Sequence, residues 1–270
     1  MRSTGVVTML VLAYSLARAQ PLPAGALEFV PAIDGSVTAV AATGWLSLAL
    51  AQKPIVDPPR CSPCDAATIN PFDRPLAGRR DRVADAISWT TAALTLAVPI
   101  AIDAGDVSRS HVGWARFGHD VGIYAEAIAL DGVVNEIVKL AVRRPRPLVY
   151  GALPVSDKAD SYVSFYSEHS SVTFAAAAAY TTIFALRHRD RPGLSALVGT
   201  GLFALATTTA SLRVVAGKHF YSDVLVGSAI GTAIGATVPL LHYYVRRRLP
   251  VDLALVPIAG GAMFTLGRSD

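Results

Sequence analysis

The chain has 270 residues, of which 52% are hydrophobic and only 16% are charged, whereas an ordinary soluble domain has roughly 25% charged residues. This composition excludes a disordered chain, a collagen and a coiled coil, and it argues against a water-soluble enzyme. The net charge of +4 does not indicate nucleic-acid binding, because the Arg residues form short clusters between apolar runs, as the loops of membrane proteins do. We therefore expect an integral membrane protein.

The first 19 residues are typical of a signal peptide. Arg2 supplies a positive charge, residues 6–16 form an apolar run, and residues 17–19 match the A-x-A cleavage pattern. We expect this segment to direct the chain to the membrane and then to be removed. An uncleaved anchor is the alternative.

Six apolar segments follow, at residues 35–52, 86–102, 119–141, 170–186, 194–211 and 221–245. Their lengths fit the range of about 17–25 residues that a membrane-spanning helix needs. The third segment carries Glu126, Asp131, Glu136 and Lys139, and ionisable residues inside a span usually face a polar interior or mark a functional site. The pattern predicts an all-α membrane bundle of about six helices.

The main helical core is expected over residues 86–248. Residues 20–85 hold the first apolar segment and a loop with both Cys residues, and residues 249–270 form a tail. In that tail, Gly260-Gly261 predicts a short hairpin over residues 253–266.

Cys61 and Cys64 lie in a Pro-rich loop after the first apolar segment. A zinc site would need two further ligands nearby, and a redox C-x-x-C motif normally opens a helix in a thioredoxin-like unit; the sequence offers neither feature. If the loop is extracytoplasmic, a local structural disulfide is the expected state of this pair.

Three polar motifs lie at the ends of apolar segments. The first runs from Lys139 to Arg146-Pro147, the second occupies residues 166–169, and the third runs from residue 211 to Asp223. The loop between the first two motifs stays on one side, and two further crossings return the chain to that side. All three motifs are therefore expected at the same membrane face.

The motifs combine groups that suit an oxyanion. Lys139, Arg146 and Arg213 are cations without matching acidic partners in the motifs, and guanidinium binds phosphate oxygens in a bidentate fork. Ser167 and the backbone amides that begin the fourth helix add hydrogen-bond donors.

Two histidines complete the set. His219 and Asp223 are spaced i, i+4, so on a helix the carboxylate can reach the imidazole, set its tautomer and leave the other ring nitrogen free to attack. With His169 as an acid, this arrangement suits phosphoryl transfer. The remaining His residues are expected to be structural: His111, His119, His188 and His242.

The ordered motifs resemble the signature of the type 2 phosphatidic acid phosphatase (PAP2) superfamily, which also includes vanadium haloperoxidases and bacterial acid phosphatases. That signature reads K-x6-R-P, then P-S-G-H, then S-R-x5-H-x3-D. The chain departs from it at three positions, with Tyr166 for Pro, Glu168 for Gly and Leu212 for Ser. Glu168 places a carboxylate beside the anion site, and its backbone N–H remains usable if the side chain points away.

The resemblance implies a metal-independent phosphatase of the membrane lipid-phosphatase branch, without a cofactor. Its substrate would be a lipid phosphomonoester or pyrophosphate of the phosphatidate, phosphatidylglycerophosphate or polyprenyl pyrophosphate type. His219 would form a phosphohistidine, Asp223 would orient it, and His169 would protonate the leaving group and then activate water. The phosphoryl oxygens would be held by Lys139, Arg146, Ser167 and Arg213.

Three alternatives use the same residues differently. A vanadate-dependent haloperoxidase-like protein would hold vanadate in the pocket, and a PAP2-like membrane protein would be inactive if Glu168 blocked the anion site. A metallohydrolase would use Glu168, His169, His219 and Asp223 as ligands, although the converging cations oppose a metal there. Membrane lipids are the expected partners, nucleic acid is not, and the sequence assigns no oligomeric state.

We expect a multi-pass protein of the bacterial inner membrane with its active site facing the periplasm. The positive-inside rule then places the basic residues 187–191 and 246–248 in the cytoplasm. The number of membrane crossings agrees with this orientation in either of two cases. The N-terminal segment stays uncleaved and does not cross the membrane, or residues 35–52 do not cross it.

Overall fold

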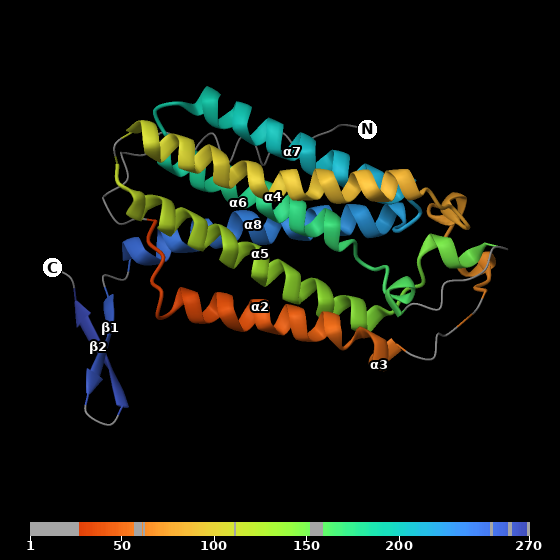
Figure 1. The fold of residues 1–270 in the computed structure, drawn as a ribbon, viewed down its shortest axis with the longest axis horizontal. Coiled ribbons are helices and arrows are strands. Elements are labelled where there is room, and N and C mark those ends of the chain that lie inside the picture. Colours follow the sequence, from red (N-terminus) through yellow and green to blue (C-terminus); the bar gives the residue numbers. More distant parts are fainter. Residues whose placement is uncertain are drawn as a thin grey trace.

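The computed structural model describes residues 27–56, 61, 63–110, 112–151, 159–248, 251–258 and 261–268. Six long helices lie side by side in this part of the chain (Figure 1). They are α2 (Asp34–Leu50), α4 (Arg82–Ser110), α5 (Trp114–Val142), α6 (Glu168–Arg187), α7 (Pro192–Val215) and α8 (Tyr221–Arg248). The predicted all-α bundle is confirmed, and the expected signal peptide at residues 1–19 lies outside the described residues.

Short elements connect these helices and follow them. Helix α3 (Gln52–Val56) continues from α2, and 3-10 turns occupy Ala66–Thr68, Arg74–Leu76, Pro147–Tyr150 and Ala159–Tyr162. Beyond α8, β1 (Val251–Ile258) pairs with β2 (Gly261–Arg268) in antiparallel fashion, where the sequence predicts a hairpin.

All the long helices except α2 extend beyond the predicted apolar segments, because polar residues at their ends continue the helical hydrogen bonding. The longest extension is in α4, which covers Arg82–Ser110 around the apolar segment at residues 86–102. Among the described helices, α4, α7 and α8 are long and apolar enough to cross a membrane. Helix α2 is short for a span, with 17 residues, and α5 carries several buried acidic residues.

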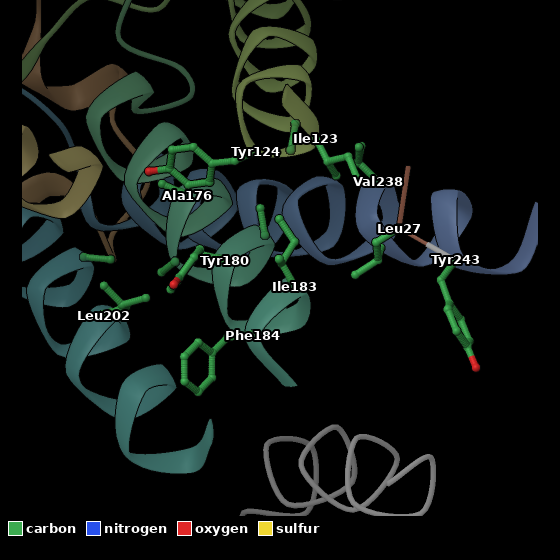
Figure 2. Close-up of a cluster of buried hydrophobic side chains, with 14 residues drawn as sticks. Leu27, Ile123, Tyr124, Ala176, Tyr180, Ile183, Phe184, Leu202, Val238 and Tyr243 are labelled. Carbon is green, nitrogen blue, oxygen red and sulfur yellow. The ribbon is translucent and has the colours of Figure 1, made fainter. Parts of the chain in front are cut away.

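The apolar core surrounds α6. Residues 175–179 of this helix are all Ala and are almost completely buried, so neighbouring helices approach it closely. Figure 2 shows large members of this cluster from four helices: Ile123, Tyr124, Tyr180, Ile183, Phe184, Leu202 and Val238.

Helices α6 and α8 touch along a row of small residues. Gly227, Gly231 and Gly235 recur every four residues on α8. A Cβ atom on Gly231 would lie 2.1 Å from the carbonyl oxygen of Ser171, and one on Gly235 would lie 2.2 Å from that of Ala175. Such small residues let two helix backbones approach within a membrane bundle.

Helix α2 meets α5 by a similar close approach. A Cβ atom on Gly132 of α5 would lie 2.2 Å from the ring of Trp45, and one on Gly44 of α2 would contact Val133 at 3.2 Å. The Trp45 ring is therefore seated directly on the backbone of α5.

We expect Gly231→Val to lower the free energy of unfolding by at least about 1–3 kcal/mol, because the added side chain cannot fit without separating α6 from α8. Thermal unfolding in detergent measures this loss. Gly201→Val in α7 is the matched control, since a Cβ atom there meets nothing within 4 Å. Equal losses in the two variants would contradict the backbone contact.

Candidate active site

The three motifs meet at one end of the bundle. Lys139 lies in the last turn of α5, His169 in the first turn of α6, Arg213 in the last turn of α7, and Asp223 in the first turn of α8. Helices α5 and α7 end where α6 and α8 begin, because the long helices alternate in direction (Figure 1). The expected gathering of the motifs at one face is therefore present in the structure.

His219 lies in the short connection between α7 and α8 and is 1% exposed. Its Nδ1 is 2.8 Å from the carbonyl oxygen of Ser164 and 3.9 Å from Oδ2 of Asp223. A carbonyl accepts only from a protonated nitrogen, so Nδ1 carries the hydrogen and Nε2 keeps its lone pair. The expected direct bond from Asp223 is replaced by this carbonyl, because the connection before α8 turns the ring toward Ser164.

Electrostatics also favour the neutral form of His219. Burial lowers the pKa of its imidazole well below the ordinary value, and the positive charges of Arg146, Arg213 and Lys139 lower it further. The uncharged ring is the form that has a nucleophilic nitrogen.

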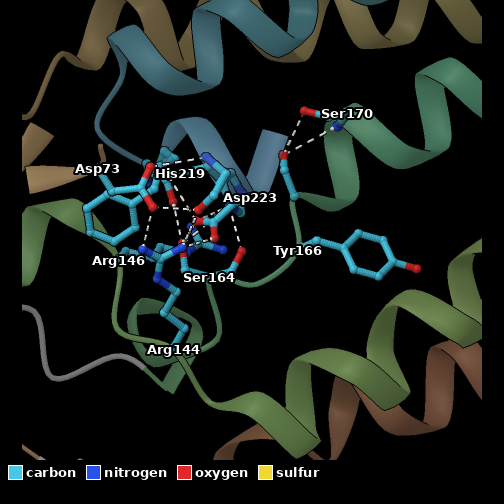
Figure 3. Close-up of polar contacts among 12 residues, drawn as sticks. Asp73, Arg144, Arg146, Ser164, Tyr166, Ser170, His219 and Asp223 are labelled. Atoms are coloured by element: carbon cyan, nitrogen blue, oxygen red, sulfur yellow. Dashed lines mark hydrogen bonds and ion pairs between the residues drawn. The ribbon is translucent and has the colours of Figure 1, made fainter. Parts of the chain in front are cut away.

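Asp223 acts on His219 through Ser164. Its Oδ2 accepts from Ser164 Oγ at 2.6 Å and from the Phe220 N–H at 2.9 Å, while its Oδ1 accepts from Arg144 at 2.6 Å. Figure 3 shows Ser164 beside Asp223 and His219, with its contacts to both drawn as dashed lines. The carboxylate thus holds the residue whose carbonyl holds the imidazole.

Arg144 ties this arrangement to a loop before α4. Its guanidinium donates to Asp73 at 2.8 Å and to Ser222 at 2.8 Å, and it lies 4.1 Å from the centre of the Phe220 ring. Asp73 is fully buried and also accepts from the Ser222 hydroxyl. Arg144 therefore connects three separate chain segments.

Arg146 and Arg213 each retain a free donor. Arg146 pairs with Asp160 at 2.6 Å, and Arg213 pairs with Asp85 at 2.6 Å and with Ser88. The Nε atoms of both arginines are buried and have no hydrogen-bond partner among the described residues.

Lys139 is 2% exposed and contacts two carboxylates. Its Nζ donates to Glu136 Oε1 at 2.8 Å and to Glu168 Oε2 in a shorter contact. The expectation that the cations lack acidic partners within the motifs is wrong at this position, because the Glu168 side chain points toward Lys139 rather than away from it.

The second motif begins α6. Ser167 caps the helix, accepting a hydrogen bond from the Ser170 N–H. His169 has its ring 4.2 Å from that of Trp89, and its Nε2 is buried without a partner in the described part of the chain. Tyr166 points away from the polar cluster (Figure 3) and is fully buried, so it packs beside the site rather than in it.

The sequence motifs did not identify several members of this site. Arg144 belongs to a basic run that is typical of a membrane flank, and Ser164 stands outside the signature. The acidic partners Asp73, Asp85 and Asp160 come from other segments, and nothing in their sequence neighbourhood marks them. Only the fold brings these side chains to the motif residues.

Other polar groups lie outside the site. Cys61 and Cys64 form a disulfide. Of the histidines expected to be structural, His242 bonds to Glu126 at 2.9 Å and lies near Asp34, which joins α8, α5 and α2 at the other end of the bundle. These three residues have the geometry to hold a metal ion, but His242 and Glu126 already satisfy each other by hydrogen bonding.

Comparison with known proteins agrees with the motifs. Residues 120–248 match the family model of the PAP2 superfamily. This segment belongs to that superfamily. Membership supports a phosphatase-type function for the chain and agrees with its membrane helices.

Among solved structures, the chain matches that of a transmembrane PAP2 type phosphatidylglycerolphosphate phosphatase from Bacillus subtilis. It is 18% identical in sequence, with a TM-score of 0.45, and the match covers 78% of this chain and 96% of that chain. No curated protein matches the chain significantly.

We expect Arg144→Ala to lower the free energy of unfolding by about 3–5 kcal/mol, because it leaves Asp73 and Asp223 buried without their cation. Arg144→Lys should restore part of this loss, since it keeps the charge without the forked geometry. Denaturant unfolding in detergent measures both variants. Arg143→Asn is the control, because Asn tolerates the left-handed backbone of that residue; a comparable loss there would contradict the network.

Proposed function

We propose that the protein is a metal-independent membrane phosphatase that hydrolyses a lipid phosphomonoester or pyrophosphate through a phosphohistidine. One observation carries the proposal: Arg146 Nε, Arg213 Nε and His169 Nε2 are buried without hydrogen-bond partners among the described residues, and the charges of both arginines act on the neutral His219. Unpaired buried donors cost free energy unless a ligand satisfies them. A phosphoryl group has the charge and the oxygen atoms to do so.

The geometry supports a two-step reaction. His219 Nε2 attacks phosphorus, which forms an N–P bond while the bond to the ester oxygen breaks. Burial and nearby cations lower the pKa of His169 to about 2; the anionic phosphoryl group offsets these cations, so His169 can bind a proton there and pass it to the departing oxygen. His169 then removes a proton from water, whose oxygen attacks the phosphohistidine and releases phosphate. The Ser164 carbonyl stabilises the positive charge that develops on the His219 ring during the first step.

The pocket also supplies the charge that the transition state requires. Arg146, Arg213 and Lys139 neutralise the phosphoryl oxygens, as fixed cations do in phosphoryl transfer. The Ser167 hydroxyl is a further hydrogen-bond donor, and the N–H groups at the start of α6 form the positive end of the helix dipole. This donor set needs no additional cation.

A lipid substrate is favoured by what surrounds His169. Its ring contacts Trp89 of α4, and Trp89 is 62% exposed on the outer face of a helix that is apolar enough to span a membrane. The pocket therefore adjoins the surface that acyl chains would cover.

We expect His219→Ala to reduce turnover of a lipid phosphate by at least about 1,000-fold, since the nucleophile is removed. Wild-type enzyme should acquire an acid-labile, base-stable phosphate label that this variant lacks. His169→Ala should still become labelled by a substrate with a good leaving group but should hydrolyse the label slowly. Wild-type turnover in His219→Ala would exclude the mechanism.

The same assay separates the alternatives. Activity should persist in EDTA and fall with vanadate, which mimics the trigonal-bipyramidal phosphorus of the transition state. Loss in EDTA that zinc or magnesium restores would indicate a metallohydrolase. No hydrolysis by the wild-type protein would indicate an inactive member of the superfamily.

We further propose that the catalytic end faces the extracytoplasmic side of a bacterial inner membrane. The Cys61–Cys64 disulfide supports this orientation, because disulfides persist in oxidising compartments. In a variant without native Cys, a Cys at position 67 should react with an impermeant maleimide in intact spheroplasts. A Cys at position 190, in the α6–α7 loop, should react only after lysis, and the reverse pattern would overturn the orientation.

A further inference from the structure

Lys139 has two acidic partners that differ in how firmly they are held. Glu136 lies on the same helix three residues earlier and is 1% exposed, and its second oxygen accepts from Gln52 at 2.7 Å. Glu168 reaches Lys139 from α6, and its side chain is 28% exposed. Glu136 is therefore a fixed partner, whereas Glu168 has room to move.

Glu168 is nevertheless held in its present position. Its Oε1 accepts from Trp45 Nε1 at 3.0 Å while its Oε2 contacts Lys139. The Trp45 ring is seated on Gly132 of α5, so the indole N–H is a rigid donor. Helix α2 thus directs the carboxylate onto the lysine.

We propose that Glu168 is an intramolecular competitor for Lys139, held by Trp45, and that it sets the affinity of the site for phosphate. This inference rests on the proposed function of the site as a phosphoryl pocket. Lys139 has one positive charge and already contacts two carboxylates, so a phosphoryl oxygen that accepts from its remaining N–H binds more weakly while Glu168 stays in contact.

Exchange of one anion for the other is physically feasible. When Glu168 leaves, Lys139 still has Glu136, so no buried charge is left uncompensated. Glu168 lies at the start of α6, where the helix dipole favours a negative charge even without Lys139. The competitor therefore weakens phosphate binding without preventing it, which limits retention of the phosphate product.

The test compares affinity for inorganic phosphate, measured by the phosphate dependence of thermal unfolding in detergent. We expect Glu168→Gln to bind phosphate about tenfold more tightly than wild type, because a charge-assisted bond to Lys139 becomes available. Trp45→Phe should bind a few-fold more tightly, since it releases Glu168 from one of its two contacts. Structural damage to the site would weaken phosphate binding. An increase in phosphate affinity therefore indicates that competition by Glu168 has been removed.

Asp190→Asn is the control, because it removes the same charge from an exposed site at the other end of the bundle, and it should leave phosphate affinity unchanged. Equal or weaker binding by both Glu168→Gln and Trp45→Phe would overturn the proposal, as would an equal gain in the control. Because binding is measured without turnover, absence of hydrolysis would count against the proposed function alone. If hydrolysis is observed, inhibition by phosphate should increase in parallel in Glu168→Gln.

Discussion

The close contact between the backbones of α6 and α8 determines the geometry of the site. Gly227, Gly231 and Gly235 leave no room for side chains between the helices, so the starts of α6 and α8 are held together. At that point the Ser167 N–H donates to the Asp223 carbonyl oxygen at 3.1 Å. The second and third motifs thus keep a fixed separation, although Ser167 and Asp223 are 56 positions apart in the sequence.

Charge compensation is the second constraint on this end of the bundle. Buried cations are costly unless acidic groups accompany them, and the structure supplies such groups from outside the signature. Asp85 of α4 serves Arg213, Asp160 serves Arg146, and Glu136 serves Lys139. Each pair leaves some donor capacity unused, so the pocket stays stable when empty and still offers hydrogen bonds to an anion.

The sequence predicts the helical bundle well, because the lengths of the apolar segments and the polar residues between them directly reflect where the packed helices begin and end. It also predicts that Lys139, His169, Arg213 and His219 lie at one site, since these residues stand at the expected spacing in the three motifs. It does not predict that the Ser164 carbonyl holds His219, because backbone direction in a connecting loop has no residue signature. The direction of the Glu168 side chain is equally hidden, since it depends on Trp45 in a distant helix.

Helices α2 and α3 lie outside the segment that matches the superfamily, which covers residues 120–248, yet Trp45 of α2 and Gln52 of α3 each contact a partner of Lys139. Part of the electrostatic setting of Lys139 therefore comes from helices outside the matched segment. Two proteins with identical motifs but different preceding helices would differ in how strongly they retain anions. Anion affinity can therefore differ between members of such a family because of changes in a helix that contains none of the motifs.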